Sequence, residues 1–393
     1  MEVVASKRIR NLTGYAFAEV DRQVEKLREA GVRCIDFGVG DPTIPTPVAI
    51  REACKRGVDE RARSGYPSYV GAKEYRDAVA AWMKRRFGVV VDPATEICST
   101  IGSKEAVFHF AEAFVDPGDV VLIPSPGYPP FSRGTLFAEG RPYFYPLLAK
   151  NRFLPDLAAI PRDVARTAKV MWVNYPNNPT GATAPVTFFK EVVAYCAENN
   201  IILCSDEAYT ELYYGEAPRS ALEFGRDGVV AFHSLSKRSA MTTYRVGFVA
   251  GDKRIVDAFK KVKTNIDSGT ATFVQDAAVA ALADETHVAE MRADYRAKRD
   301  VLVGALKGIG LADAAPDATL YVWQPVPRGM TSVEFAKRLL APEVALVTTP
   351  GAWVSDVTAE GLNPGEGFVR FALVPSMEET REAAERLKRV VLK

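Results

Sequence analysis

The chain has 393 residues, of which 48% are hydrophobic and 25% are charged, a composition typical of globular domains. Its 50 Lys and Arg residues balance 49 Asp and Glu residues, so charge gives no reason to expect a nucleic-acid or anionic-membrane partner. No apolar run approaches the roughly 20 residues of a transmembrane helix, and the first residues contain no apolar signal-peptide core.

Cysteine and histidine usage argues against disulfides and metal sites. The five cysteines are odd in number and scattered through apolar contexts, which predicts free thiols in a reducing cytoplasm. None of the three histidines has metal-ligand spacing, so no zinc or iron site is expected.

Short apolar runs alternate with helical patterns through the middle of the chain. The runs cover residues 119–124, 168–176, 201–206 and 228–234, and such runs are typical of strands buried on both faces of a parallel sheet. Residues 184–200 have apolar side chains at the spacing of an amphipathic helix. This alternation predicts an α/β fold in which ligands bind beyond the carboxyl ends of the strands.

The pattern changes from about residue 286. A long charged helix is predicted first and another helix last, with a strand pair at 319–326 and 344–351 and a further strand at 367–374 between them. A single core stops growing near about 250–300 residues, so we predict a second, α+β domain with which the first residues pack.

Three polar side chains follow three of the predicted strands. They are Asn178, Asp206 and Lys237, with Tyr209 three residues beyond Asp206. Because parallel strands end at one edge of a sheet, we expect these groups to converge. An aldehyde-bearing pyridine cofactor requires such a set: an amine to form an imine, a carboxylate to keep the ring nitrogen protonated, and groups that hydrogen-bond the ring hydroxyl. Taken singly, Asp206 could be a helix cap, Asn178 a turn residue and Lys237 a surface lysine.

A phosphate site is predicted at the start of a helix in residues 99–114. Gly102 and Ser103 precede this amphipathic helix, whose N-terminal N–H groups attract an anion. Ser103 could equally be a plain N-cap. Three further residues could complete the site: Ser234, Ser236 and Arg245. Tyr128 is held between prolines and could stack on a flat cofactor or pack on the surface.

The stretch SLSKRSAMTTYRVGF at 234–248 resembles the signature of class I and II aminotransferases, which are pyridoxal 5'-phosphate enzymes of fold type I. Further family motifs occur in order from about residue 35 to 376: YPSYVG, GSKEA, NNPTG, DEAY and FVRFAL. The resemblance implies a large domain with a mostly parallel seven-stranded sheet between helices, plus a small α+β domain. We assign residues 45–285 to the large domain and residues 1–44 with 286–393 to the small one.

The resemblance also implies roles for individual residues. Lys237 forms the imine with the cofactor, and Asp206 pairs with its ring nitrogen. Asn178 and Tyr209 hold the ring oxygen, while Tyr128 stacks on the ring. The implied phosphate ligands are Ser103, the backbone N–H of Lys104, Ser234, Ser236 and Arg245.

Other implied roles concern the substrate and a second subunit. Tyr66 is expected to reach the phosphate of a neighbouring subunit, which implies a homodimer. Arg370, with Gly40 and Asn178, is expected to bind the α-carboxylate of an amino acid or 2-oxo acid. Thr243 stands where the family usually has glycine, which questions the local turn and not the chemistry.

Longer stretches such as GVGDPTIPTP and KVKTNIDSGTATFVQDA are most similar to the LL-diaminopimelate aminotransferases, which implies amino transfer between LL-diaminopimelate and 2-oxoglutarate in lysine biosynthesis. The variant SLSKRS is also similar to N-succinyl-diaminopimelate aminotransferases, and neighbouring subgroups act on aspartate, alanine or aromatic amino acids. Tyr15 is a candidate for substrate side-chain recognition, although a packing role is equally compatible with its sequence context.

Three other classes compete with this interpretation. The GVG at 38–40 suggests a nicotinamide dehydrogenase, but Thr43 breaks the dinucleotide fingerprint. A β-lyase or cyclopropane-forming synthase would use the same cofactor residues, so only its products would distinguish it. A non-catalytic effector-binding module is disfavoured by the intact Lys237.

Overall fold

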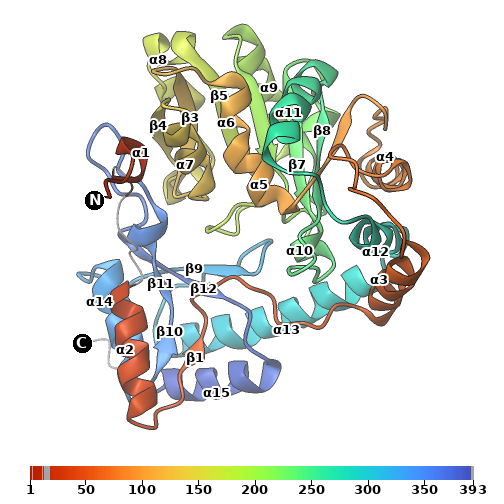
Figure 1. Ribbon diagram of the computed structural model, residues 1–393. Coiled ribbons are helices and arrows are strands. Elements are labelled where there is room, and N and C mark those ends of the chain that lie inside the picture. The colour runs from red at the N-terminus through yellow and green to blue at the C-terminus, as the bar shows by residue number, and fades with distance from the viewer. Residues whose placement is uncertain (2, 11, 13–17, 391–393) are drawn as a thin grey trace.

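The structure is a computed structural model that describes residues 1, 3–10, 12 and 18–390 (Figure 1). Its centre is a seven-stranded sheet in the order β2-β8-β7-β6-β5-β3-β4. These strands are β2 (Ile97–Thr100), β3 (Val120–Ser125), β4 (Arg141–Pro146), β5 (Ala168–Asn174), β6 (Ile202–Asp206), β7 (Val229–Ser234) and β8 (Gly247–Gly251). β8 runs antiparallel to both of its neighbours and the remaining pairs are parallel, which confirms the predicted fold class.

Helices cover both faces of this sheet because its strands are apolar on both sides. In β5, Val170 and Trp172 belong to one buried cluster, while Met171 and Val173 belong to another, as the two-residue period of a strand requires. The first cluster includes residues of α5 (Gly102–His109), α6 (Ala111–Phe114), α7 (Pro130–Phe137) and α11 (Lys253–Ile266). The second includes residues of α3 (Val48–Glu60), α4 (Lys73–Phe87), α8 (Arg162–Thr167), α9 (Val186–Glu198) and α12 (Thr272–Ala283).

The predicted elements of this region are found with small shifts. The four apolar runs form β3, β5, β6 and β7, and the helix predicted over 184–200 is α9. Strands β2, β4 and β8 did not stand out as apolar runs; β4 has only one fully buried position. Short 3-10 turns complete the connections: η1 (Ala149–Asn151), η2 (Leu157–Ala159), η3 (Ala221–Glu223) and η4 (Gly351–Val354).

Two small sheets lie in the lower half of Figure 1. One is antiparallel, in the order β11-β12-β9, and the other is the parallel pair β1-β10. The strands are β1 (Ile35–Asp36), β9 (Tyr321–Pro325), β10 (Leu346–Val347), β11 (Thr349–Pro350) and β12 (Phe368–Ala372). The expected pairing of 319–326 with 344–351 is therefore wrong. The second run divides at Thr348, so that its halves pair with β1 and β12.

Helices α2 (Ala18–Glu29), α13 (Thr286–Gly308), α14 (Ser332–Leu339) and α15 (Met377–Leu387) pack around these small sheets. Helix α1 (Lys7–Arg10) instead lies near the end of α7, where Arg8 donates to the Phe137 carbonyl at 3.5 Å. The main core of the region around the small sheets shares no residue with the clusters of the large sheet, although four buried residues from 45–285 reach into it: Tyr209, Leu212, Tyr214 and Ala240. The domain division at 45–285 stays a prediction, which these separate cores support. Among the described residues, no helix is long and apolar enough to cross a membrane.

Candidate active site

A cavity of about 520 Å³ opens at the carboxyl ends of the central strands. Nearly all the predicted site residues line it: Gly40, Ser103, Lys104, Tyr128, Asn178, Asp206, Tyr209, Ser234, Ser236, Lys237, Arg245 and Arg370. Tyr66 is not among the lining residues and is 93% exposed. Tyr15 lies outside the described residues. The cavity therefore brings the ends of the central strands together with Gly40 and Arg370, which are 330 positions apart in the sequence.

Lys237 lies on α10 (Leu235–Arg238), a single helical turn that begins directly after β7. Its Nζ donates a hydrogen bond to the Gly40 carbonyl at 2.6 Å. Burial lowers the pKa of the Lys237 amine, because a charged ammonium loses its hydration there. An amine with a depressed pKa is a competent nucleophile and proton carrier.

Asp206 ends β6 and is buried. One of its carboxylate oxygens accepts a hydrogen bond from the Ala208 N–H at 3.2 Å. Burial, with a smaller contribution from the neighbouring Glu207, raises the pKa of Asp206 to about 7. A cationic N–H placed against this carboxylate would restore its charge, so the site fits a protonated ring nitrogen.

Tyr209 follows Asp206 by three residues, and its hydroxyl lies 3.0 Å from the hydroxyl of Tyr321. The Arg370 guanidinium lies 4.5 Å from the centre of the Tyr321 ring. Tyr321 also packs so closely on Gly40 that a Cβ at Gly40 would lie 2.1 Å from its hydroxyl. Our sequence analysis missed Tyr321. It placed the residue in a strand, but only the strand's register shows which side chains face the cavity.

Arg370 is buried on β12, and all its hydrogen-bond acceptors are neutral. They are the Asn178 side-chain oxygen at 3.1 Å, the Gly38 carbonyl at 2.9 Å and the Thr349 hydroxyl at 3.3 Å. The guanidinium charge thus remains available to an anion in the cavity. Arg370, Gly40 and Asn178, which were predicted to act together, all line this cavity.

Asn174, a second residue that sequence analysis missed, connects two of these groups. Its side-chain amide donates to the Asp206 carbonyl at 2.8 Å, and its oxygen accepts from the Asn178 N–H at 2.8 Å. Asn174 ends β5, so its position at a strand end was the one available signal. It holds the loop that carries Asn178 against β6.

The predicted phosphate site lies where Arg245 meets the start of α5. Gly102 has φ 66°, which favours glycine, and a Cβ there would lie 2.4 Å from an Arg245 nitrogen, so that the guanidinium would have to move. The backbone of Arg245 is also in the left-handed region, with φ 53°, and its guanidinium donates a hydrogen bond to the Thr242 carbonyl at 2.8 Å. Ser234 accepts a hydrogen bond from the Ser236 N–H at 3.2 Å. We call Gly102, Ser103, Ser234, Ser236 and Arg245 the phosphate cup.

Two remaining expectations concern Tyr128 and Thr243. Tyr128 lines the cavity and packs edge-on against Phe131, with ring centres 5.7 Å apart. Thr243 does not have a left-handed backbone, so the turn tolerates a residue other than glycine there. Taken together, the cavity fits a flat, phosphorylated aldehyde with a basic ring nitrogen: an amine, a buried carboxylate, an aromatic wall and a cationic cup.

Comparisons with known proteins agree with this chemistry. The family model described as aminotransferase class I and II matches residues 32–387. The chain is 46% identical to an LL-diaminopimelate aminotransferase of Aquifex aeolicus over 391 residues, covering 98% of this chain and 99% of that protein. It is 45% identical to LL-diaminopimelate aminotransferase 2 of Trichormus variabilis over 388 residues, covering 98% and 97%.

Solved structures show the same fold. A mutant aspartate aminotransferase of Thermus thermophilus superposes with a TM-score of 0.91 at 29% identity, covering 99% of this chain and 100% of that one. A probable N-succinyldiaminopimelate aminotransferase of Thermus thermophilus superposes with a TM-score of 0.88 at 32% identity, covering 96% and 100%.

Proposed function

The chain belongs to the class I and II aminotransferase family and is a pyridoxal-phosphate-dependent transaminase, and from this premise we propose that it exchanges an amino group between LL-diaminopimelate and 2-oxoglutarate in lysine biosynthesis. The cavity in which Lys237, Asp206 and Arg370 meet supports the transaminase chemistry, and the similarity to named relatives supports the choice of substrate. Relatives named for this activity are 43–46% identical over nearly the whole chain, whereas the aspartate and N-succinyldiaminopimelate enzymes above are 29–32% identical.

The cavity residues divide the work of the reaction. When bound, pyridoxal phosphate supplies an aldehyde for the substrate amine and a protonated ring that withdraws electrons from the substrate Cα. The Lys237 Nζ would hold the cofactor and, once displaced by the substrate amine, would take the proton from Cα as a base and deliver it as an acid to the former aldehyde carbon of the cofactor. Burial raises the pKa of Asp206 to about 7, and a protonated ring nitrogen beside it would lower that pKa again, so that the ionised carboxylate would keep the proton on the ring nitrogen.

The other residues orient the two ligands. Asn178 and Tyr209 hold the ring oxygen, Tyr128 covers the ring face, and the phosphate cup with the Lys104 N–H binds the phosphate. Arg370 binds the substrate α-carboxylate with Gly40 and Asn178. Tyr321 fixes both Tyr209 and Arg370, through the hydroxyl contact and the ring face respectively.

We also propose that the protein acts as a homodimer in the cytoplasm. Tyr66 is 93% exposed on its own subunit, which suits a side chain that completes the phosphate site of a partner. All five cysteines are free thiols, as expected in a reducing compartment.

A half-reaction assay tests the substrate assignment. The visible absorbance of the bound cofactor is followed while LL-diaminopimelate, glutamate, aspartate, alanine and phenylalanine are added singly. We expect fast bleaching by LL-diaminopimelate and glutamate only. Fast bleaching by aspartate, alanine or phenylalanine instead would leave the aminotransferase assignment intact but would show that the proposed substrate is wrong. Release of ammonia and a keto acid without any amino acceptor would indicate a β-lyase.

The variant Lys237→Ala is the control for the chemistry itself. It should lose both the visible absorbance and transamination, because the imine and the proton transfer both need the Lys237 amine. Full activity in this variant would overturn the mechanism.

A further inference from the structure

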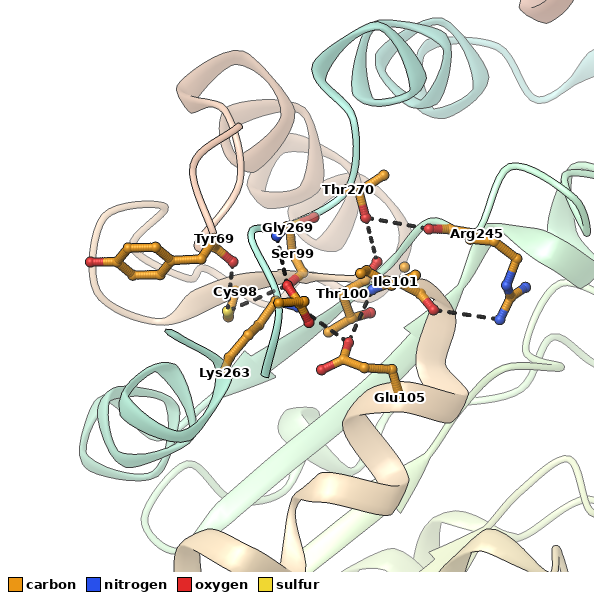
Figure 2. A network of polar contacts seen from close by, with 12 residues as sticks. Tyr69, Cys98, Ser99, Thr100, Ile101, Glu105, Arg245, Lys263, Gly269 and Thr270 are labelled. Atoms are coloured by element: carbon orange, nitrogen blue, oxygen red, sulfur yellow. Dashed lines mark hydrogen bonds and ion pairs between the residues drawn. The ribbon is translucent and has the colours of Figure 1, made fainter. Parts of the chain in front are cut away.

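A buried lysine, Lys263, lies between the carboxylates of Glu105 and Asp267. Figure 2 shows Lys263 and Glu105 together with Arg245 of the phosphate cup. Lys263 of α11 has no exposed surface. Its Nζ lies 2.8 and 2.9 Å from the two Asp267 carboxylate oxygens and 3.3 Å from a Glu105 oxygen. A fully buried ammonium is costly unless it is paired, so this placement needs a reason.

The Glu105 arm of this cluster reaches the first peptide of the cup. The Glu105 oxygen that contacts Lys263 also accepts a hydrogen bond from the Ile101 N–H at 3.0 Å. The Ile101 carbonyl accepts from Arg245 at 3.4 Å. Ile101, the residue before Gly102, is therefore held at its N–H by Glu105 and at its carbonyl by Arg245, as Figure 2 shows.

The Asp267 arm reaches the same place by a different route. Asp267 accepts a hydrogen bond from the Gly269 N–H at 2.6 Å, which shapes a turn. The next residue, Thr270, places its hydroxyl 3.0 Å from the Thr100 carbonyl and 3.3 Å from the Arg245 carbonyl. Both arms thus end on the backbone that presents Gly102 and Arg245.

We propose that Lys263 is a positioning residue for cofactor phosphate binding. It neutralises Glu105 and Asp267, so that the hydrogen bonds of these two carboxylates fix the distance between the Gly102 turn and Arg245 in the phosphate cup. The proposal rests on the proposed function, because it requires that the cup bind phosphate. Without Lys263, two buried carboxylates would repel each other and would face an incoming phosphate dianion through a low-dielectric region.

The test compares two ligands of the full-length protein that differ only in the phosphate. Dissociation constants for pyridoxal phosphate and for pyridoxal are measured by absorbance titration of the wild type and of Lys263→Met. We expect affinity for pyridoxal phosphate to fall by about tenfold or more, while affinity for pyridoxal changes less than about twofold. Equal losses for both ligands, or no loss for either, would overturn the proposal.

Two further variants separate positioning from folding. Lys263→Met/Glu105→Gln removes one of the stranded charges and keeps an oxygen acceptor for Ile101, so it should recover part of the lost affinity. Lys298→Met is the matched control, since Lys298 is also buried and paired with an aspartate one turn away, Asp294, at 2.8 Å. It should lower stability without changing the ratio of the two dissociation constants.

If Lys263→Met does not fold, the double variant decides the question. Weaker pyridoxal-phosphate binding than in Glu105→Gln alone then supports the proposal, and equal binding overturns it. A wild-type protein that does not bind pyridoxal phosphate would instead contradict the proposed function.

Discussion

Asp206 and Arg370 show how individual residues reserve charge for ligands. Asp206 is a buried carboxylate whose nearest polar partner is one backbone N–H, and Arg370 is a buried guanidinium whose acceptors are neutral. Each charge is costly in the protein alone. A cationic ring nitrogen would compensate the charge of Asp206, and the substrate carboxylate would compensate the charge of Arg370. Ligands that lack these groups leave the buried charges unpaired and should therefore bind more weakly.

Asp206 should make the stability of the cofactor-free protein depend on pH. Its folded-state pKa of about 7 lies above the ordinary value of 3.8, so the stability it contributes at low pH is lost as the pH rises through about 7. Relative to Asp206→Asn, the wild-type free energy of unfolding should fall by about 3 kcal/mol between pH 5 and pH 8. Urea denaturation at several pH values measures this. Parallel curves for the two proteins would contradict the assignment.

Arg370→Ala should raise the KM for every α-carboxylate substrate, by about 100-fold. The physical reason is the loss of a charge-assisted bond common to all amino and keto acids. Arg370→Lys keeps the charge but loses the two parallel donors of the guanidinium, so its KM should lie between the values of the wild type and of Arg370→Ala. Steady-state kinetics with two donors and two acceptors checks this. An effect confined to one substrate would show that Arg370 recognises a side chain instead.

At the scale of elements, the site depends on where strands end and one helix begins. Strands β5 and β6 end at Asn174 and Asp206, and α10 follows the end of β7, so these groups lie at one edge of the sheet. At the start of α5, the left-handed backbone of Gly102 lets the chain approach Arg245 closely. Local chain geometry therefore sets the width of the phosphate cup. Adding a methyl group at Gly102 is the smallest change that tests whether this turn sets the width of the phosphate cup.

Gly102→Ala should weaken cofactor binding by about tenfold or more, because its Cβ would displace Arg245. Gly88→Ala is the matched control: Gly88 ends α4 with φ 70° and has open space around its would-be Cβ. Both variants should lose about 1 kcal/mol of stability from the left-handed backbone. Cofactor titration and thermal unfolding distinguish them, and equal cofactor affinities would show that Arg245 can move without loss.

At the scale of the whole molecule, the proposed homodimer makes each site a joint product of two subunits. Tyr66 lies outside its own cavity, so Lys237→Ala and Tyr66→Ala would damage different sites. Mixed dimers of these two inactive variants should contain one intact site each. Random mixing should then restore about a quarter of wild-type activity. Co-expression with two affinity tags tests this, and no recovery in purified mixed dimers would exclude a shared site.

The central fold and most of the chemistry were predictable from local sequence. Apolar runs marked β3, β5, β6 and β7 because strands buried on both faces need continuous apolar residues. The residues after those runs could be expected to share a cavity, since parallel strands end together. This rule places Lys237, Asp206 and Asn178 in one cavity without the use of any long-range contact, and all three line it.

Tertiary structure decided what depends on residues distant in the chain. The pairing of β10 with β1, the contact of Tyr321 with Tyr209 and Gly40, and the joining of Lys263 to Glu105 link segments more than 100 positions apart. Burial likewise set the charge preferences of Asp206 and Lys237. The sequence pattern reveals the periodicity of each helix or strand. Strand register, side-chain burial and the electrostatic environment of a charged group depend instead on which segments the folded chain brings together.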